Sequence, residues 1–72
     1  MVVGIADQLF ARAKTAWTRA ELEKADPAKY WQLAADRFAE VMIVPGIDPK
    51  LRTAAADLRD QANAKVAAAS RP

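Results

Sequence analysis

The chain of 72 residues contains no cysteine and no histidine. Without cysteine it forms no disulfide and offers neither a thiolate nucleophile nor a cysteine ligand for a metal. Without histidine it lacks the imidazole that most often serves as a general base or binds zinc. Its hydroxyl groups therefore have no imidazole to activate them, although nucleophilic catalysis needs a base beside the nucleophile. We predict a protein that is not an enzyme and that uses no cofactor or metal.

Paired carboxylates are the remaining candidates for chemistry. Asp36 and Glu40 stand four residues apart, and Asp57 and Asp60 stand three apart, so each pair shares a face if its segment is helical. Both faces point away from the expected core, where carboxylates are normally solvated. The sequence therefore predicts no catalytic, cofactor-binding or metal-binding residue.

Glycine occurs only twice, whereas alanine supplies 18 of the 72 residues. Alanine has the highest helix propensity and glycine the lowest after proline, so the composition predicts an all-α protein. No apolar run approaches the ~18 residues that indicate a membrane helix. The first five residues carry no basic side chain and are soon followed by Asp7, unlike a signal peptide. We expect a cytoplasmic protein, and the bias towards alanine and arginine is typical of GC-rich bacterial and phage genomes.

Two Asp-Pro pairs, at residues 26–27 and 48–49, mark the starts of helices. The aspartate can accept hydrogen bonds from backbone N–H groups two and three residues on. Proline suits the first helical position, because the N–H group that it lacks has no partner there. The middle helix ends before Pro45, because the residue preceding a proline is disfavoured in the α region. The pattern predicts three helices, over residues 5–25, 27–43 and 49–69, with residues 1–4 and 70–72 frayed.

Each predicted helix carries its apolar residues on one face when the residues are placed 100° apart. Amphipathic helices joined by short loops pack as antiparallel neighbours. We therefore predict one domain, residues 1–72, folded as an up-down-up three-helix bundle. Its core sets large residues against small ones, as close packing requires. The expected pairs are Trp17 with Ala34 and Ala35, Trp31 with Ala20 and Ala62, Phe38 with Ala55, and Leu58 with Ala35.

The second helix has more apolar residues than a single core face needs. Tyr30, Leu33 and Val44 widen its apolar arc to roughly 200°, and Leu22 lies on the back of the first helix. Packing between two neighbours buries part of such an arc, but an apolar patch beside charges is also typical of a partner site. We predict that a partner helix or protein docks there, as in helix-in-groove recognition. The expected contact residues are Tyr30, Leu33 and Val44, with Arg37, Arg52 and Arg59 as a charged rim.

Two alternatives remain open. Arg52 and Arg59 stand seven residues apart on the third helix, and such a stripe can follow a phosphate backbone. Arg12 and Arg19 repeat the spacing on the first helix. However, eleven basic and nine acidic residues leave a net charge of only +2, and Asp48 is placed to pair with Arg52. The first alternative is a nucleic-acid-binding accessory or regulatory protein, and the second is a structural or assembly component that associates with itself.

A family resemblance rests on the second and third helices. The second reads Trp31-x-x-Ala-x-x-x-Phe38, and the third ends Gln61-Ala-Asn-Ala-Lys65. Over residues 6–66 the chain resembles the microtubule-interacting-and-trafficking (MIT) domain and, more broadly, a tetratricopeptide helical hairpin. The resemblance implies a three-helix bundle that binds a partner peptide or helix in a groove between its helices. The chain departs from the family at Asn63, where the family has an acidic residue, and in the sharper turn at Pro45-Gly46.

Overall fold

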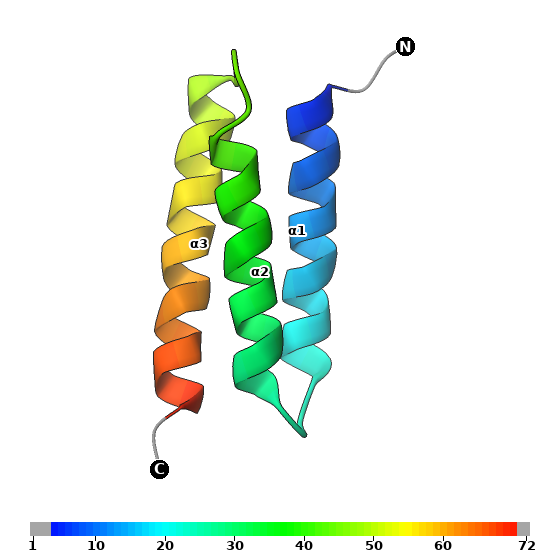
Figure 1. Ribbon diagram of the computed structural model, residues 1–72, viewed down its shortest axis with the longest axis vertical. Helices are drawn as coiled ribbons and strands as arrows, with labels where there is room; N and C mark the ends of the chain where they lie inside the picture. The colour runs from blue at the N-terminus through cyan, green and yellow to red at the C-terminus, as the bar shows by residue number, and fades with distance from the viewer. Residues whose placement is uncertain (1–3, 71–72) are drawn as a thin grey trace.

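The computed structural model describes residues 4–70, which form three antiparallel α-helices joined by two short loops (Figure 1). This is the predicted all-α architecture. Of the ends predicted to fray, residues 1–3 and 71–72 lie outside the described residues. Ser70 closes the last helix, because its N–H donates to the Val66 carbonyl over 3.0 Å. The helices are α1 (Ile5–Leu22), α2 (Pro27–Met42) and α3 (Pro49–Ala69).

Helix α1 ends at Leu22, three residues before the predicted end at residue 25. Glu23 leaves the helix in an extended conformation, with φ −81° and ψ 128°. Its carboxylate accepts a hydrogen bond from the Ala25 N–H over 3.1 Å. The prediction missed this end because the chain must reverse direction before α2 begins, and a helix running to residue 25 would leave no residues for the turn.

The two Asp-Pro pairs start helices as predicted. Asp26 caps α2, and its carboxylate accepts from the Lys29 N–H over 3.5 Å. Asp48 caps α3, and its carboxylate accepts from the Lys50 N–H over 2.8 Å. A hydrogen bond of 2.8 Å is well formed, whereas one of 3.5 Å is at the limit. The start of α3 is therefore capped more firmly than the start of α2.

The loop between α2 and α3 is a tight turn over residues 44–47, one residue beyond the Ile43 cap of α2. The Ile47 N–H donates to the Val44 carbonyl over 3.3 Å. Gly46 has a φ of +72°, and proline precedes it, which is the pattern of a type II β-turn. The turn folds Ile47 back into the core, where it is only 6% exposed. Helical periodicity could not predict this core residue, because it belongs to no helix.

Helix α2 lies in the middle, with α1 and α3 packed on its two flanks (Figure 1). The outer helices have no extensive contact with each other. The Cα atoms accordingly occupy a slab of 45 × 20 × 13 Å. The bundle is therefore open, and every large contact in the fold involves α2.

The core consists of two clusters, and the side chains of α2 are central to both. The predicted pairing of Trp31 with Ala20 and Ala62 is found in one cluster, and Phe38 shares the other with Ala55. Leu58 packs on this second cluster rather than on the one that contains Ala35, so that predicted pair is wrong. The lower cluster contains Ala16, Ala20, Trp31, Ala34, Ala35 and Ala62. The upper cluster contains Ala13, Phe38, Val41, Ile47 and Ala55.

The large side chains of α1 also pack against large side chains of α2. Trp17 meets Trp31 edge to face, with ring centroids 4.9 Å apart, and it meets Phe38 at 6.1 Å. Phe10 lies against Phe38 at 5.6 Å. Edge-to-face geometry places the positive edge of one ring on the negative face of the other, so these pairs stabilise beyond simple burial. The pattern of large against small therefore holds for α3 but only in part for α1.

No helix within residues 4–70 is long and apolar enough to cross a membrane.

Candidate partner-binding groove

A groove with a volume of about 660 Å³ runs between α1 and α2. Helix α1 contributes Arg12, Arg19 and Leu22, and α2 contributes Tyr30 and Leu33. Smaller residues of α1 complete its wall. We call this hollow the α1/α2 groove.

Two of the groove's side chains are apolar and exposed. Leu22 is 72% exposed and Leu33 is 39% exposed, and they face the groove from opposite helices. Tyr30 is half-buried because its ring packs on the lower core cluster. Only two further large apolar residues, Ile5 and Ile43, are exposed within residues 4–70. Half of the exposed large apolar side chains in the described chain therefore gather in one groove.

The charged residues that line the groove are both basic. The Arg19 guanidinium lies 5.1 Å from the centre of the Tyr30 ring, and Lys29 Nζ lies 5.9 Å from it, both within cation–π range. Arg19 also forms an ion pair with Glu23, at 3.7 Å. Arg12 has no carboxylate partner within residues 4–70. No acidic residue lines the groove, so it presents two arginines beside its apolar residues.

The structure brings together only two of the six predicted contact residues, Tyr30 and Leu33. Arg37 lies one turn beyond Leu33 on α2, and its guanidinium pairs with Glu40 at 3.2 Å. Val44 lies at the far end of α2, where it packs on the upper core cluster. Val44 thus lies apart from Tyr30 and Leu33, because it follows the end of α2 whereas they belong to its first half.

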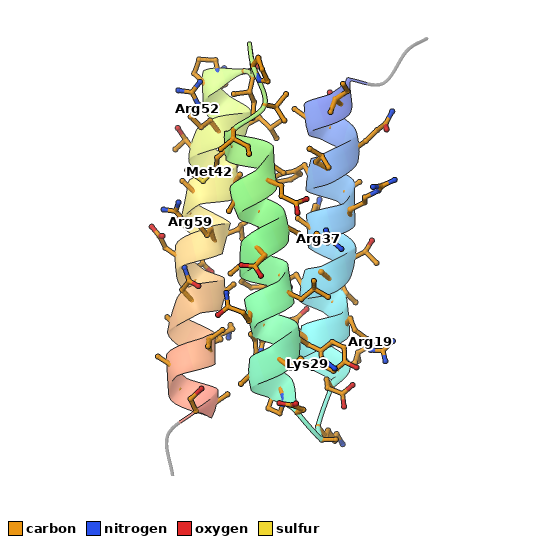
Figure 2. The ribbon with its side chains drawn as sticks, in the orientation of Figure 1. Arg19, Lys29, Arg37, Met42, Arg52 and Arg59 are labelled. Atoms are coloured by element: carbon orange, nitrogen blue, oxygen red, sulfur yellow. The ribbon has the colours of Figure 1, made fainter. Side chains whose placement is uncertain are left out.

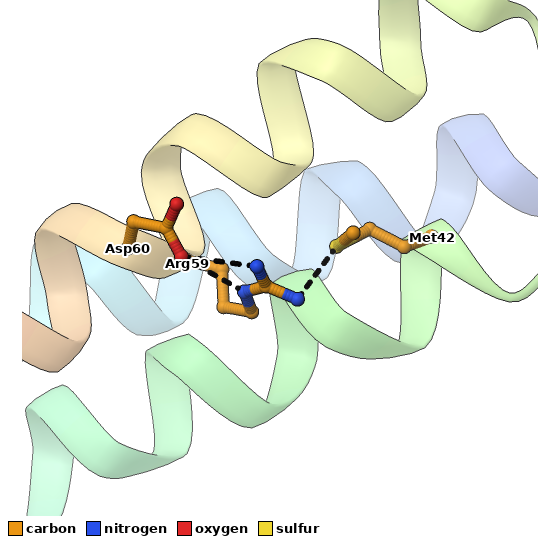
Figure 3. A network of polar contacts seen from close by, with 3 residues as sticks. All are labelled: Met42, Arg59 and Asp60. Atoms are coloured by element: carbon orange, nitrogen blue, oxygen red, sulfur yellow. Dashed lines mark hydrogen bonds and ion pairs between the residues drawn. The ribbon is translucent and has the colours of Figure 1, made fainter.

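The predicted rim residues Arg52 and Arg59 belong to α3, on the opposite flank of α2 from the groove (Figure 2). Arg59 donates to Asp60 Oδ1 over 3.2 and 3.0 Å, and to Met42 Sδ over 3.4 Å (Figure 3). The contact with Met42 therefore links α3 to the last residue of α2. Arg52 has no carboxylate partner within residues 4–70, because Asp48 accepts from the backbone of Lys50 instead.

The sequence interpretation did not include Arg12, Arg19 and Leu22 among the contact residues. Their signals were visible, since the arginines are seven residues apart and Leu22 lies on the back of its helix. Nothing in the sequence connected them with Tyr30 and Leu33, because helical periodicity does not say which flank of α2 receives α1. The antiparallel packing makes that connection.

Two other hollows lie among the described residues. One of about 210 Å³ lies over Phe38, between Trp17 and Leu58, where the outer helices fail to meet. Another, of about 730 Å³, separates the start of α1 from the turn before α3. Among residues 4–70 no group of three or more acidic residues is placed to hold a metal ion. The carboxylates of Asp36 and Asp57 instead accept hydrogen bonds from glutamines on their own helices.

Comparison with protein-family models, curated proteins and solved structures finds no match to this chain. The resemblance to the MIT domain therefore stays a prediction, and a function must be argued from the groove itself.

Proposed function

We propose that this chain is a small non-catalytic interaction module, an accessory protein of a bacterium or phage, that docks a helix of a partner protein in the α1/α2 groove. The observation that carries the proposal is that Leu22 and Leu33 line one groove from two different helices. Both remain exposed although the core beneath them is closed. Exposed apolar side chains that gather in a concave site, with charges beside them, are characteristic of partner surfaces.

The groove suits a helix because it runs along two antiparallel helices. A partner helix lying along it would pack as another neighbour of α1 and α2, with apolar residues spaced three and four apart directed into the groove. Burying a fully exposed leucine contributes about 1.5–3 kcal/mol, and association itself costs several kcal/mol. Two leucines and one tyrosine therefore favour a reversible complex over a permanent one.

Selection from a displayed library of amphipathic helical peptides tests the proposal. We expect wild-type protein to enrich peptides whose binding is lost with Leu33→Asp. Leu33 is already 39% exposed, so this variant should keep its helical circular dichroism. Ile43→Asp is the matched control, because Ile43 is 79% exposed at the end of α2, outside the groove. Peptides that bind Leu33→Asp as well as wild type would show that the groove is not the site.

Light scattering behind a sizing column separates docking of a foreign helix from self-association. We expect a mass near the 7.8 kDa of the chain at two protein concentrations. A dimer that Leu58→Asp dissociates and Leu33→Asp does not would overturn the proposal. It would favour an assembly component that associates through the hollow over Phe38.

A further inference from the structure

We infer that the helix accepted by the α1/α2 groove is acidic and carries two carboxylates about two turns apart. The inference rests on the proposed function and adds the chemistry of the partner. It comes from the positions of Arg12 and Arg19, which line the groove together with its two exposed leucines.

The two arginines set a spacing. Seven residues separate them, so they share one face of α1 and stand about 10.5 Å apart along its axis. A partner helix lying parallel or antiparallel to α1 has the same rise per residue. Acidic residues seven apart on that helix would face both guanidinium groups, and apolar residues on the same face would contact Leu22 and Leu33.

The contacts that Arg12 and Arg19 make within the chain leave both guanidinium groups able to bind a partner carboxylate. Arg12 has no carboxylate partner within the described chain, and Arg19 reaches Glu23 only at 3.7 Å. The Arg19 side chain is 63% exposed although that of Glu23 is only 19% exposed, so a partner carboxylate can reach the guanidinium from its open side. A guanidinium binds a carboxylate through two parallel N–H donors, which adds geometric selectivity. Lys29, beside Tyr30, extends the basic surface at one end of the groove.

The same arginines favour a peptide over a nucleic acid. Leu22 and Leu33 line the same groove as the arginines and offer nothing to a phosphate backbone. The net charge of +2 also gives a weak electrostatic footprint for a polyanion. A basic partner helix is disfavoured, because it would bring like charges together around the groove.

The peptides selected above carry the test. We expect the enriched sequences to contain glutamate or aspartate pairs seven residues apart, with leucine-like residues between them. A peptide of that pattern should bind Arg12→Glu/Arg19→Glu about tenfold more weakly than wild type, because two ion pairs are replaced by contacts between like charges. Lys50→Glu/Arg52→Glu is the matched control, because it changes the net charge equally on α3, outside the groove.

The possible failures are distinguishable. Enriched peptides that need Leu33 but show no acidic bias would overturn this inference and leave the proposed function standing. Loss of the Leu33 dependence would overturn both. A short DNA duplex that binds more tightly than any selected peptide, and that loses binding in Arg12→Glu/Arg19→Glu, would assign the arginines to nucleic acid instead.

Discussion

The two interfaces of α2 are built from different side chains. Towards α1 the contact is aromatic, with Phe10 and Trp17 set edge to face against Trp31 and Phe38. Towards α3 the buried residues are alanines, Ala55 and Ala62, flanked by half-buried leucines and a valine. The buried side chains of α2 therefore pack against large aromatic residues of α1 on one flank and against alanines of α3 on the other.

The two flanks of α2 also differ in the large apolar side chains that they leave exposed. Helix α3 leaves no large apolar side chain exposed within the described residues, so its apolar surface is used within the fold. The α1–α2 interface places its large rings towards the core and leaves Leu22 and Leu33 outside. The exposed leucines on which the proposed function rests therefore lie on the flank of α2 that carries α1 and not on the flank that carries α3.

The largest expected effect is that of Phe38→Ala, because Phe38 belongs to both interfaces. It is 1% exposed and contacts the rings of Phe10 and Trp17, and it shares a cluster with Ala55. Removing such a side chain costs about 3–5 kcal/mol. A domain of this size has about that much stability in total, so the variant should be unfolded by circular dichroism. Phe10→Ala, half-buried at one interface, should stay folded with a lower urea midpoint. Equal midpoints for the two variants would contradict the central role of α2.

Ala62→Leu should destabilise the α2–α3 interface by about 1–3 kcal/mol, because a larger side chain must push against Trp31. Ala64→Leu is the control, since Ala64 is exposed on the same helix and should change the unfolding free energy by less than about 0.5 kcal/mol. Urea unfolding measures both. Equal unfolding free energies for the two variants would show that the α2–α3 interface does not depend on the small size of its buried alanines.

Gly46→Ala should cost about 1–2 kcal/mol, because alanine resists the left-handed conformation that Gly46 adopts at φ +72°. A Cβ atom there would meet no atom within 4 Å, so the cost comes from the backbone alone. Gly46→Asn should recover part of it, since asparagine tolerates this region. Thermal unfolding followed by circular dichroism checks the order of stability, which should be wild type, then Asn, then Ala.

The smallest effects should be at the helix caps, and they should differ between α2 and α3. Asp48→Ala should cost about 1 kcal/mol, as is usual for the loss of an N-cap side chain. Asp26→Ala should cost less, because its bond to the Lys29 N–H is 3.5 Å long against 2.8 Å for that between Asp48 and the Lys50 N–H. Chemical denaturation of the two variants measures the difference, and Asp48→Asn should stay near wild type. A larger loss at Asp26 would reverse the ranking of the two caps.

Much of the fold could be predicted because local rules decide it. The Asp-Pro pairs determined the starts of α2 and α3, and Pro45 limited the length of α2, which ends at Met42, one residue before the predicted end. The buried stripe of α2, including Trp31 and Phe38, follows from the period of the helix. The end of α1 was predicted three residues too late, because it is set by the return of the chain rather than by a residue type.

The candidate site could be predicted only in part. The excess of apolar residues on α2 identified Tyr30 and Leu33, but it grouped them with Val44, which lies beyond the other end of that helix. The arginines of α3 were assigned to the rim, whereas those of α1 line the groove. Every helix of an antiparallel bundle has two flanks, and helical periodicity does not say which of them a given neighbour covers.

The sequence by itself determined three helices, their starts and the face that each buries, because propensity, capping and periodicity act between residues close in the chain. Only the tertiary structure decided that α2 is central and that the outer helices stay apart. It also decided that Arg12, Arg19 and Leu22 line one groove with Tyr30 and Leu33. Those relations depend on how side chains from separate helices interlock. That packing is a property of the assembled surfaces and not of any one segment.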